Sequence, residues 1–323
     1  MFLGIDTSNY TTSLAVVDIK GDLLEDRRKT LPVPEGERGL QQSKALFYHL
    51  QNIPELMEEV FTRIKGREIL AVAASSRPRP QEGSYMPVFR AGTVLSGSVS
   101  ALLQVPAVAT SHQEGHVLAG LWSVQKQDLA SCLVIHLSGG TTELLLVNRK
   151  RERPLRFEIK ILGGSSDIQA GQLVDRVGTA MGLSFPCGPA LEKLARESEC
   201  YSEKERAKAA IPSFVKGLEM SFSGAETQAI AFLKKGIPPP LVARGVERCI
   251  AAAVEKAARR AVNDTGQKEV LLVGGVAAND FLRSHLRQKL EHRSVGARLL
   301  FPEVRFCGDN AVGVSLVARS ALR

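Results

Sequence analysis

Short apolar runs, each closed by a polar turn, recur along the chain. Residues 2–6 and 12–17 form the first pair of runs, and residues 133–137 and 143–147 form a similar pair around the turn Ser138-Gly139-Gly140-Thr141-Thr142. Apolar runs of about four to eight residues that end in turn signals are typical of buried strands. Each half of the chain is therefore expected to open with a strand, a tight turn and a returning strand.

A second pattern, in which apolar residues recur every three to four positions, predicts a helix over residues 43–64, with Pro54 as a kink or break. The other expected elements are, in chain order, a strand at 23–28, a loop at 31–42, a strand at 69–74, a loop at 77–87, a helix at 91–103, a strand at 270–273, a helix near 278–290, a strand at 299–301 and a helix from about 309. Strands that alternate with helices in this way predict an α/β protein.

The two matching turns point to a particular architecture. Turns rich in small residues expose backbone N–H groups, and two of them facing each other across a cleft can hold phosphates from both sides. Either turn alone fits an ordinary hairpin equally well. Together they favour the two-lobed actin-like fold (the duplicated RNase H-like ASKHA architecture), with a nucleotide cleft between the lobes. We expect one lobe to comprise 1–128 and 308–323, and the other to comprise 129–307.

Composition limits the class of protein only broadly. With 323 residues the chain can bury a large core, and its net charge of +8 is compatible with a polyanionic partner or with a merely basic surface. The five cysteines are odd in number and lack CxxC spacing, which argues against a disulfide framework or a thiolate zinc site. No signal peptide and no apolar run near about 18 residues are present, so we expect a cytoplasmic protein without a membrane span.

The histidines of Ser111-His112-Gln113-Glu114-Gly115-His116 carry the first chemical signal. Ser111 is a suitable N-cap, so both histidines fall in the first turns of a helix and lie on one face, where they can reach one metal ion. Gly115 is unfavourable in a helix and suggests a close approach there. Ordinary core or surface histidines would give the same pair. The metalloprotease pattern has Glu directly after the first His, whereas this chain has Gln113.

Two further segments have side chains or backbone suited to ligand binding. Gly274 and Gly275, between a strand and a helix, would let a ligand approach the backbone, with Asn279 as helix N-cap or ligand donor. Asp175, expected on one helix with Asp167, can accept hydrogen bonds from ribose hydroxyls. A simple turn and a solvated acid are the alternatives.

Asp309 allows two interpretations. By residue type and position it is a good N-cap for the last helix. If that helix packs back on the first lobe, however, Asp309 meets His112 and His116, and two imidazoles with one carboxylate form a metal site.

Taken in order, these segments resemble the catalytic-subunit family of tRNA threonylcarbamoyladenosine synthases (TsaD-type), formerly described as O-sialoglycoprotein endopeptidases or glycoproteases. The resemblance covers nearly the whole chain. It is carried by Gly4-Ile-Asp-Thr-Ser8, His112-Gln-Glu-Gly-His116, Ser138-Gly-Gly140, Asp167 to Asp175, Met220-Ser-Phe-Ser-Gly224, Gly274-Gly-Val-Ala-Ala-Asn279 and Cys307-Gly-Asp-Asn310.

The resemblance implies a two-lobed actin-like transferase. Its members move a threonylcarbamoyl group from threonylcarbamoyl-adenylate to N6 of adenine 37 in tRNAs that read ANN codons, together with a paralogous partner subunit and a small ATPase. The implied ligands are one divalent metal (iron or zinc) and an adenine nucleotide (threonylcarbamoyl-adenylate or ATP). The implied site residues are His112, His116 and Asp309 for the metal, Ser138, Gly139 and Gly140 for the acyl-phosphate region, and Asp175, Gly188, Gly274, Gly275 and Asn279 for the adenosine.

Three positions depart from the family pattern. Thr141 stands where the family has His, residues 76–85 replace a Gly-Pro-Gly loop, and Glu226 replaces a lysine. Losing glycines and a positive charge changes the surroundings of the reacting group. The alternative function is therefore a diverged paralogue that binds an adenine nucleotide and acts as another carbamoyltransferase or as a non-catalytic regulator. A zinc peptidase is a third hypothesis, which Gln113 disfavours.

Overall fold

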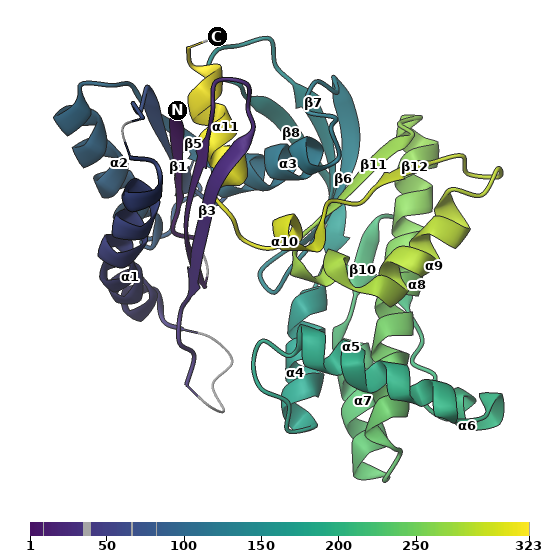
Figure 1. Cartoon of the computed structure of the whole chain (residues 1–323). Coiled ribbons are helices and arrows are strands. Elements are labelled where there is room, and N and C mark those ends of the chain that lie inside the picture. Colours follow the sequence, from purple (N-terminus) through teal and green to yellow (C-terminus); the bar gives the residue numbers. More distant parts are fainter. Residues whose placement is uncertain (9, 35–39, 66, 82, 323) are drawn as a thin grey trace.

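The computed structural model (Figure 1) contains two β-sheets with helices around and between them. It describes residues 1–8, 10–34, 40–65, 67–81 and 83–322. Asn9 of the first turn, residues 35–39 of the expected 31–42 loop and Glu82 of the 77–87 loop lie outside the described residues.

The first sheet has the strand order β3-β2-β1-β4-β5. Its strands are β1 (Phe2–Asp6), β2 (Thr11–Val17), β3 (Leu23–Thr30), β4 (Ala71–Arg77) and β5 (Ala107–Ser111). β1 pairs antiparallel with β2 and parallel with β4. The expected strands at 2–6, 12–17 and 23–28 are confirmed.

The second sheet has the same arrangement of five strands, in which β6 takes the central place of β1, and adds two strands beyond β8. Its strand order is β12-β11-β6-β7-β8-β10-β9. Its strands are β6 (Ser131–Leu137), β7 (Thr142–Arg149), β8 (Phe157–Ser165), β9 (Phe214–Lys216), β10 (Glu219–Ser221), β11 (Glu269–Val273) and β12 (Arg298–Leu300). β6, like β1, pairs antiparallel with the next strand and parallel with a strand that follows a helix. The turns before β2 and β7 therefore occupy equivalent places, as the sequence predicts.

The helices fill the space around the sheets. They are α1 (Gln42–Arg63), α2 (Phe89–Leu103), α3 (His112–Ser123), α4 (Ala170–Ala180), α5 (Gly188–Arg196), α6 (Glu203–Ala207), α7 (Ser223–Lys234), α8 (Pro239–Thr265), α9 (Asp280–Leu290), α10 (Val304–Cys307) and α11 (Val312–Ser320), with short 3-10 turns at Glu197–Cys200 and Gly275–Ala278. None of the helices in the described part of the chain has the length and apolar character that crossing a membrane requires.

Side chains along β1 alternate between the two faces of the first sheet, and different helices cover each face. Leu3 and Ile5 join a core with α1 and α2, whereas Phe2 joins a core with α3 and α11. That second core also contains Val134 of β6 and Val273 of β11. Successive strand residues face opposite sides of a sheet. Since all five residues of β1 are buried, both faces of the sheet are covered at this strand. Helix α3 consequently lies between the two sheets, and its residues from His112 to Leu121 are buried.

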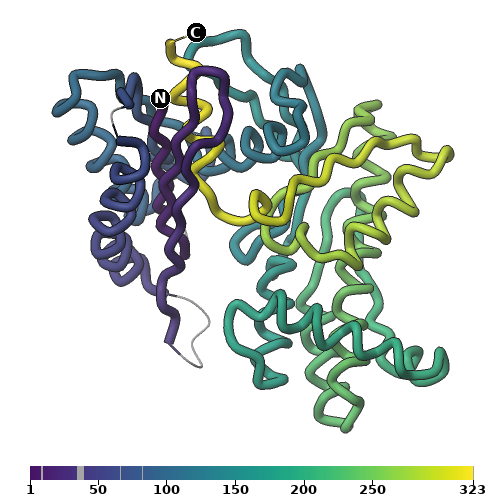
Figure 2. Tube along the Cα trace, viewed as in Figure 1, coloured from purple at the N-terminus to yellow at the C-terminus, as the bar shows by residue number. Residues whose placement is uncertain are grey.

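Close backbone packing positions the last helix against α3. In Figure 2 the yellow C-terminal segment returns to the purple first strand. A Cβ atom added to Gly313 would lie 1.9 Å from the carbonyl oxygen of Gly115, and one added to Gly4 would lie 2.3 Å from the Ser315 nitrogen. Only glycine permits such approaches. The close approach expected at Gly115 is therefore confirmed, and its partner is α11.

Three local predictions are wrong. The first is the break, one of the two alternatives at Pro54: helix α1 continues through this residue, because Leu56 and Val60 beyond it are buried against the first sheet and this packing outweighs the lost hydrogen bond. Asp167 precedes α4 and instead accepts hydrogen bonds from the backbone of Phe222 and Ser223.

The third correction concerns Asp309 as N-cap. The last helix begins at Val312, with Ala311 as its N-cap residue. Asn310 forms the turn before it, because its side chain accepts from Val312 N at 3.0 Å and donates to Gly308 O at 2.9 Å. The side chain of Asp309 is therefore not used as the cap.

We predict that Gly313→Ala lowers the free energy of unfolding by about 2–3 kcal/mol, because the added methyl group overpacks the contact between α3 and α11. Gly97→Ala is the matched control, since Gly97 lies in α2 with open space around it and alanine should add about 0.5–1 kcal/mol there. Urea unfolding measures both variants. Equal stability of the two would contradict close packing at Gly313.

Candidate functional site

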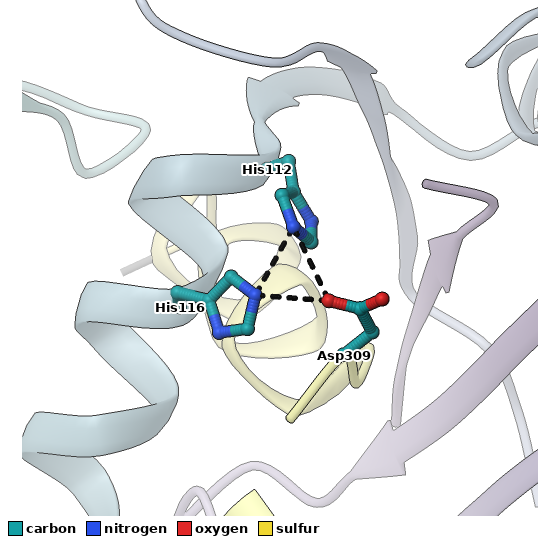
Figure 3. Close-up of side chains that lie close together, drawn as sticks. All are labelled: His112, His116 and Asp309. Atoms are coloured by element: carbon teal, nitrogen blue, oxygen red, sulfur yellow. Dashed lines mark hydrogen bonds and ion pairs between the residues drawn. The ribbon is translucent and has the colours of Figure 1, made fainter. Parts of the chain in front are cut away.

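Helix α3 begins with a capping box that fixes the orientation of its first turn. The Ser111 side chain accepts from Glu114 N, and the Glu114 carboxylate accepts from Ser111 N at 3.0 Å. The spacing of four residues then places His112 and His116 on one face of the helix (Figure 3). The expected cap at Ser111 is confirmed.

Three side chains converge beside this first turn. The Nε2 atoms of His112 and His116 are 3.0 Å apart, and Asp309 Oδ1 lies 3.2 Å from His116 Nε2 and 3.4 Å from His112 Nε2. Among the described residues, these three form the one group of His, Cys, Asp or Glu whose ligand atoms all lie within 4.8 Å of one another. The packing of α11 on α3 brings Asp309 to the histidines, as the second interpretation of this residue predicts.

Two residues from the first sheet orient His112. Asp6 Oδ2 lies 2.9 Å and Ser8 Oγ 2.8 Å from His112 Nδ1. A carboxylate at this distance accepts the Nδ1 proton and directs Nε2 toward Asp309, as in the second shell of many metal sites. Sequence reasoning missed Asp6 as a site residue, although an acid at the end of a fully buried strand is a usable signal.

The cluster holds a positive charge between carboxylates. Burial alone would lower the pKa of His112, but the charge of Asp6 and the contacts with Asp309 outweigh burial and raise this pKa to about 10. Burial and the neighbouring His112 lower the pKa of His116. Burial raises the pKa of Asp309, but hydrogen bonds from both histidines leave that pKa far below its usual range.

These contacts fit a divalent cation. Two imidazole Nε2 atoms and one carboxylate oxygen are suitable ligands for zinc or iron, and three protein ligands leave positions open for a substrate. The carboxylates of Asp6 and Asp309, which favour a positive charge on His112, would equally favour a bound cation. His116 Nδ1 is buried and has no partner among the described residues. The polar contacts of this ring are therefore those of Nε2 with His112 and Asp309.

A third histidine lies next to the cluster. His136 of β6 is buried, its ring centroid lies 5.0 Å from that of His116, and neither of its nitrogens has a hydrogen-bond partner within the described part of the chain. Its burial among positive groups lowers its pKa well below the usual value. Sequence reasoning treated His136 only as part of a strand. A polar residue inside a buried apolar strand was the available signal.

The turn after β6 continues from His136 toward a cavity. Ser138 Oγ accepts from Thr141 N at 3.0 Å and so holds the turn closed. Gly171 of α4 packs on it, because an added Cβ would lie 2.6 Å from Gly139 N. Gly139 itself lines the cavity, whereas Gly140 lines a smaller polar hollow beside Thr141.

A cavity of about 400 Å³ lies in the second half of the molecule. This volume falls within the range of small-molecule sites, which is about 300–1,000 Å³. Much of its lining is aliphatic. The expected site residues on its wall are Gly139, Asp175, Gly188, Gly275 and Asn279.

Carboxylates supply most of the polar lining of this cavity. Asp175 Oδ1 accepts from Cys187 N at 2.8 Å, and burial raises the pKa of Asp175. Glu247 accepts from Asn279 Nδ2 at 2.7 Å and from Arg244 at 2.6 Å. Burial raises the pKa of Glu247 to about 7. Such acceptors suit ribose hydroxyls and exocyclic amines. Sequence reasoning missed Glu247, because nothing marks one acid within a long helix.

Gly274 has a different place from Gly275. Its φ is +96°, and an added Cβ would lie 2.1 Å from Leu137 O. Gly274 thus lets the backbone after β11 lie against the end of β6 and is not part of the cavity wall. Asn279 caps α9, since its Oδ1 accepts from Leu282 N at 2.8 Å.

The positions that depart from the family pattern have local partners. Arg79, in the rebuilt loop, forms an ion pair with Glu143 of β7, and Glu143 also accepts from Gln113 Nε2 at 3.0 Å. Glu226 pairs with Arg176 of α4 at 3.0 Å. Glu226 is therefore paired with the neighbouring helix α4 and does not line the cavity.

Comparison with known proteins identifies relatives along almost the whole chain. The family model described as tRNA N6-adenosine threonylcarbamoyltransferase (TsaD) matches residues 34–315. The tRNA N6-adenosine threonylcarbamoyltransferase of Methanothrix thermoacetophila is 31% identical over 99% of this chain and 90% of its own length. The protein of the same name from Archaeoglobus fulgidus is 29% identical over 97% of this chain and 88% of its own.

One group of relatives is longer. The probable bifunctional tRNA threonylcarbamoyladenosine biosynthesis protein of Methanothermobacter thermautotrophicus is 30% identical over 97% of this chain, but the match spans 54% of that protein. This chain thus corresponds to about half of the bifunctional relative.

Solved structures show the fold. The activator of the 2-hydroxyisocaproyl-CoA dehydratase from Clostridium difficile superimposes with a TM-score of 0.54 at 13% identity and covers 99% of this chain and 94% of its own. A ROK family glucokinase from Streptomyces griseus gives a TM-score of 0.51 at 14% identity and covers 98% of this chain and 97% of its own. The expected actin-like α/β fold is confirmed.

The family match extends over most of the chain, and full-length relatives carry the same functional name. The motifs that predicted this relationship are present in the structure as a histidine pair, a glycine turn and a cavity wall. The chain belongs to the tRNA N6-adenosine threonylcarbamoyltransferase family, a family of enzymes that transfer a threonylcarbamoyl group to tRNA.

Proposed function

We propose that this chain transfers a threonylcarbamoyl group from threonylcarbamoyl-adenylate to N6 of adenine 37 in tRNAs that read ANN codons. One observation carries the proposal. His136 lies beside the metal-ligand cluster, and Gly139, three residues later, lines the cavity. Since three residues span at most about 11 Å, the glycine turn joins the two places. A nucleotide in the cavity would thus present its acyl-phosphate near the cluster.

In this proposal some of the residues bind the ligands and others orient them. His112, His116 and Asp309 would hold iron or zinc, which when bound polarises a carbonyl or phosphoryl oxygen. Asp6 keeps His112 in the required orientation. Asp175 and Asn279 would bind the ribose and base, beside Gly188 and Gly275. Holding the acyl group and the attacking amine at fixed positions is itself a large part of such catalysis.

The main-chain groups around the glycine turn would bind the acyl-phosphate region. Ser138, Gly139 and Gly140 form a turn with little side-chain bulk, and Gly171 in the first turn of α4 packs against it. A helix N-terminus favours negative charge. These residues therefore bind and orient the anionic end of the nucleotide.

The proposed partners follow from the family. We propose tRNA as the substrate, with a paralogous partner subunit and a small ATPase as further components. The match spans only 54% of the bifunctional relative. The rest of that relative therefore leaves room for a second component of the same process, which for this chain would be a separate partner protein. The net charge of +8 suits a polyanionic substrate.

A second candidate function is favoured by the changed surroundings of the glycine turn. Arg79 forms an ion pair with Glu143 next to Thr141, in place of the flexible glycine loop of the family pattern. This candidate is a paralogue that binds an adenine nucleotide and has another carbamoyltransferase activity or a regulatory role. It would need the cavity, but it would not need the family's surroundings of the acyl-phosphate region.

For the metal, we predict that His112→Ala and His116→Ala each abolish stoichiometric binding of zinc or iron, because each removes one of three ligands. Asp6→Asn should weaken the affinity by about 10–100-fold, as expected for a group that orients a ligand. Inductively coupled plasma mass spectrometry after reconstitution measures the content. His292→Ala is the control, since His292 is exposed in a loop. Full metal content in both alanine variants would rule out this site.

For the cavity, we predict that Asp175→Ala weakens binding of AMP by about 10–100-fold, because a hydrogen bond to a charged group contributes about 1.5–3 kcal/mol. Isothermal titration calorimetry measures the affinity. Asp264→Ala is the matched control, since Asp264 lies near the exposed end of α8 and pairs with Arg260. An unchanged affinity in Asp175→Ala would contradict the assignment of the cavity.

For the reaction, we predict that the full-length protein modifies tRNA in a reconstituted system with threonylcarbamoyl-adenylate and the partner proteins, and that His112→Ala does not. Mass spectrometry of the digested tRNA detects the product. Absence of product with every tRNA and the complete partner set would contradict the proposal. Comparable weak binding of ATP and threonylcarbamoyl-adenylate would then favour the second candidate.

A further inference from the structure

Two aromatic rings from distant parts of the sequence meet near both candidate sites. Tyr10 lies in the turn between β1 and β2, and Phe185 lies in the segment between α4 and α5 (Figure 1). Their ring centroids are 5.7 Å apart, and the planes make an angle of 77°. One ring thus comes from the first sheet's side of the molecule and the other from the second sheet's side.

The pair has functional neighbours on both sides. Tyr10 is two residues from Ser8, whose hydroxyl contacts His112. Phe185 directly precedes Pro186, which lines the cavity, and Cys187, whose N–H donates to Asp175. Along the chain, one ring is therefore close to a residue of the metal-ligand cluster, and the other is close to the cavity wall.

Neither ring serves an ordinary packing role. Both side chains are only partly buried, and neither belongs to a hydrophobic core cluster within the described part of the chain. Neither lines the 400 Å³ cavity, so neither is positioned to hold the adenine of the nucleotide. Backbone contacts nevertheless fix the place of Tyr10, since its carbonyl accepts from Leu31 N at 2.7 Å.

We propose that Tyr10 and Phe185 form a stacking platform for the acceptor nucleobase, an adenine exposed in a single-stranded RNA loop. The proposal rests on the proposed transferase function and names the element that recognises its second substrate. Bases in RNA loops are commonly held between aromatic rings, and enzymes that modify a base take it out of its stack. The edge-to-face contact between the two rings is exchanged for base contacts when the adenine enters.

This arrangement gives the two adenines of the reaction different binding environments in one active site. The nucleotide's adenine enters an aliphatic cavity with carboxylate acceptors. The acceptor adenine, by contrast, meets two aromatic faces near the metal-ligand cluster. Stacking leaves the edge of the base free, so its exocyclic amine can point toward the acyl group.

The test uses the full-length protein and an anticodon stem-loop RNA that carries 2-aminopurine at the acceptor position. Stacking on an aromatic ring quenches 2-aminopurine fluorescence, so wild-type protein should quench the probe on binding. We expect Tyr10→Ala and Phe185→Ala to lose the quenching and to raise the Kd at least tenfold, which corresponds to about 1.4 kcal/mol. Tyr10→Phe keeps the ring and should stay within twofold of wild type.

Two controls separate stacking from other effects. Phe214→Ala removes an aromatic side chain that is 64% exposed in β9, and it should leave both quenching and Kd unchanged. AMP binding, measured by calorimetry, should be the same in Tyr10→Ala, Phe185→Ala and wild type. If both alanine variants lose AMP binding as well, the pair is a contact that closes the cleft, and the platform is overturned.

The failure of this inference is distinguishable from the failure of the transferase proposal. Transfer by wild type, with full quenching and unchanged Kd in both alanine variants, would overturn the platform alone. No quenching by wild type would also overturn it. Ring-dependent quenching without any transfer would leave the platform standing and would count against the transferase reaction instead.

Discussion

Two buried imidazoles, the buried carboxylate of Asp6 and the partly buried carboxylate of Asp309 meet at the start of α3, and the rest of the structure depends on how their charges are balanced. His112 and His116 face Asp309 on one side, and Asp6 faces His112 on the other. Buried ionisable groups are costly unless each has a partner of opposite charge or a hydrogen bond. The structure meets this requirement with groups from the first strand, the third helix and the segment before the last helix.

This cluster is also where the two halves of the chain join. Helix α3 packs on both sheets, and a Cβ added to its Gly120 would lie 2.9 Å from Val273 Cγ1 of β11. His136 brings β6 of the second sheet to the ring of His116. A ligand that binds in the cavity and a cation held by α3 would therefore be connected through packed elements that include the glycine turn.

The parts of the structure that the sequence predicts are those encoded locally. The apolar runs predict the strands, and the Ser111–Glu114 capping box marks the start of α3. The strand pairs around two small-residue turns predict the duplicated fold, because each half must bury a sheet with the same strand order.

The remaining features depend on contacts between distant segments. By residue type Asp309 is an N-cap, and only the return of α11 to Gly115 and Gly4 brings it to the histidines. Pro54 breaks an isolated helix but not one whose next turn is buried. Glu247 and His136 became candidates only through their neighbours in space. The family resemblance, in contrast, groups residues that are far apart in the sequence, because it draws on the order of motifs along the whole chain.

We propose that His112, His116 and Asp309 bind one metal ion at the junction of the two halves. Extended X-ray absorption fine structure of the metal-loaded protein tests it most directly. We expect two imidazole ligands at about 2.0–2.1 Å and an oxygen shell at about 2.0–2.2 Å. A sulfur shell near 2.3 Å, or a spectrum without imidazole scattering, would contradict it.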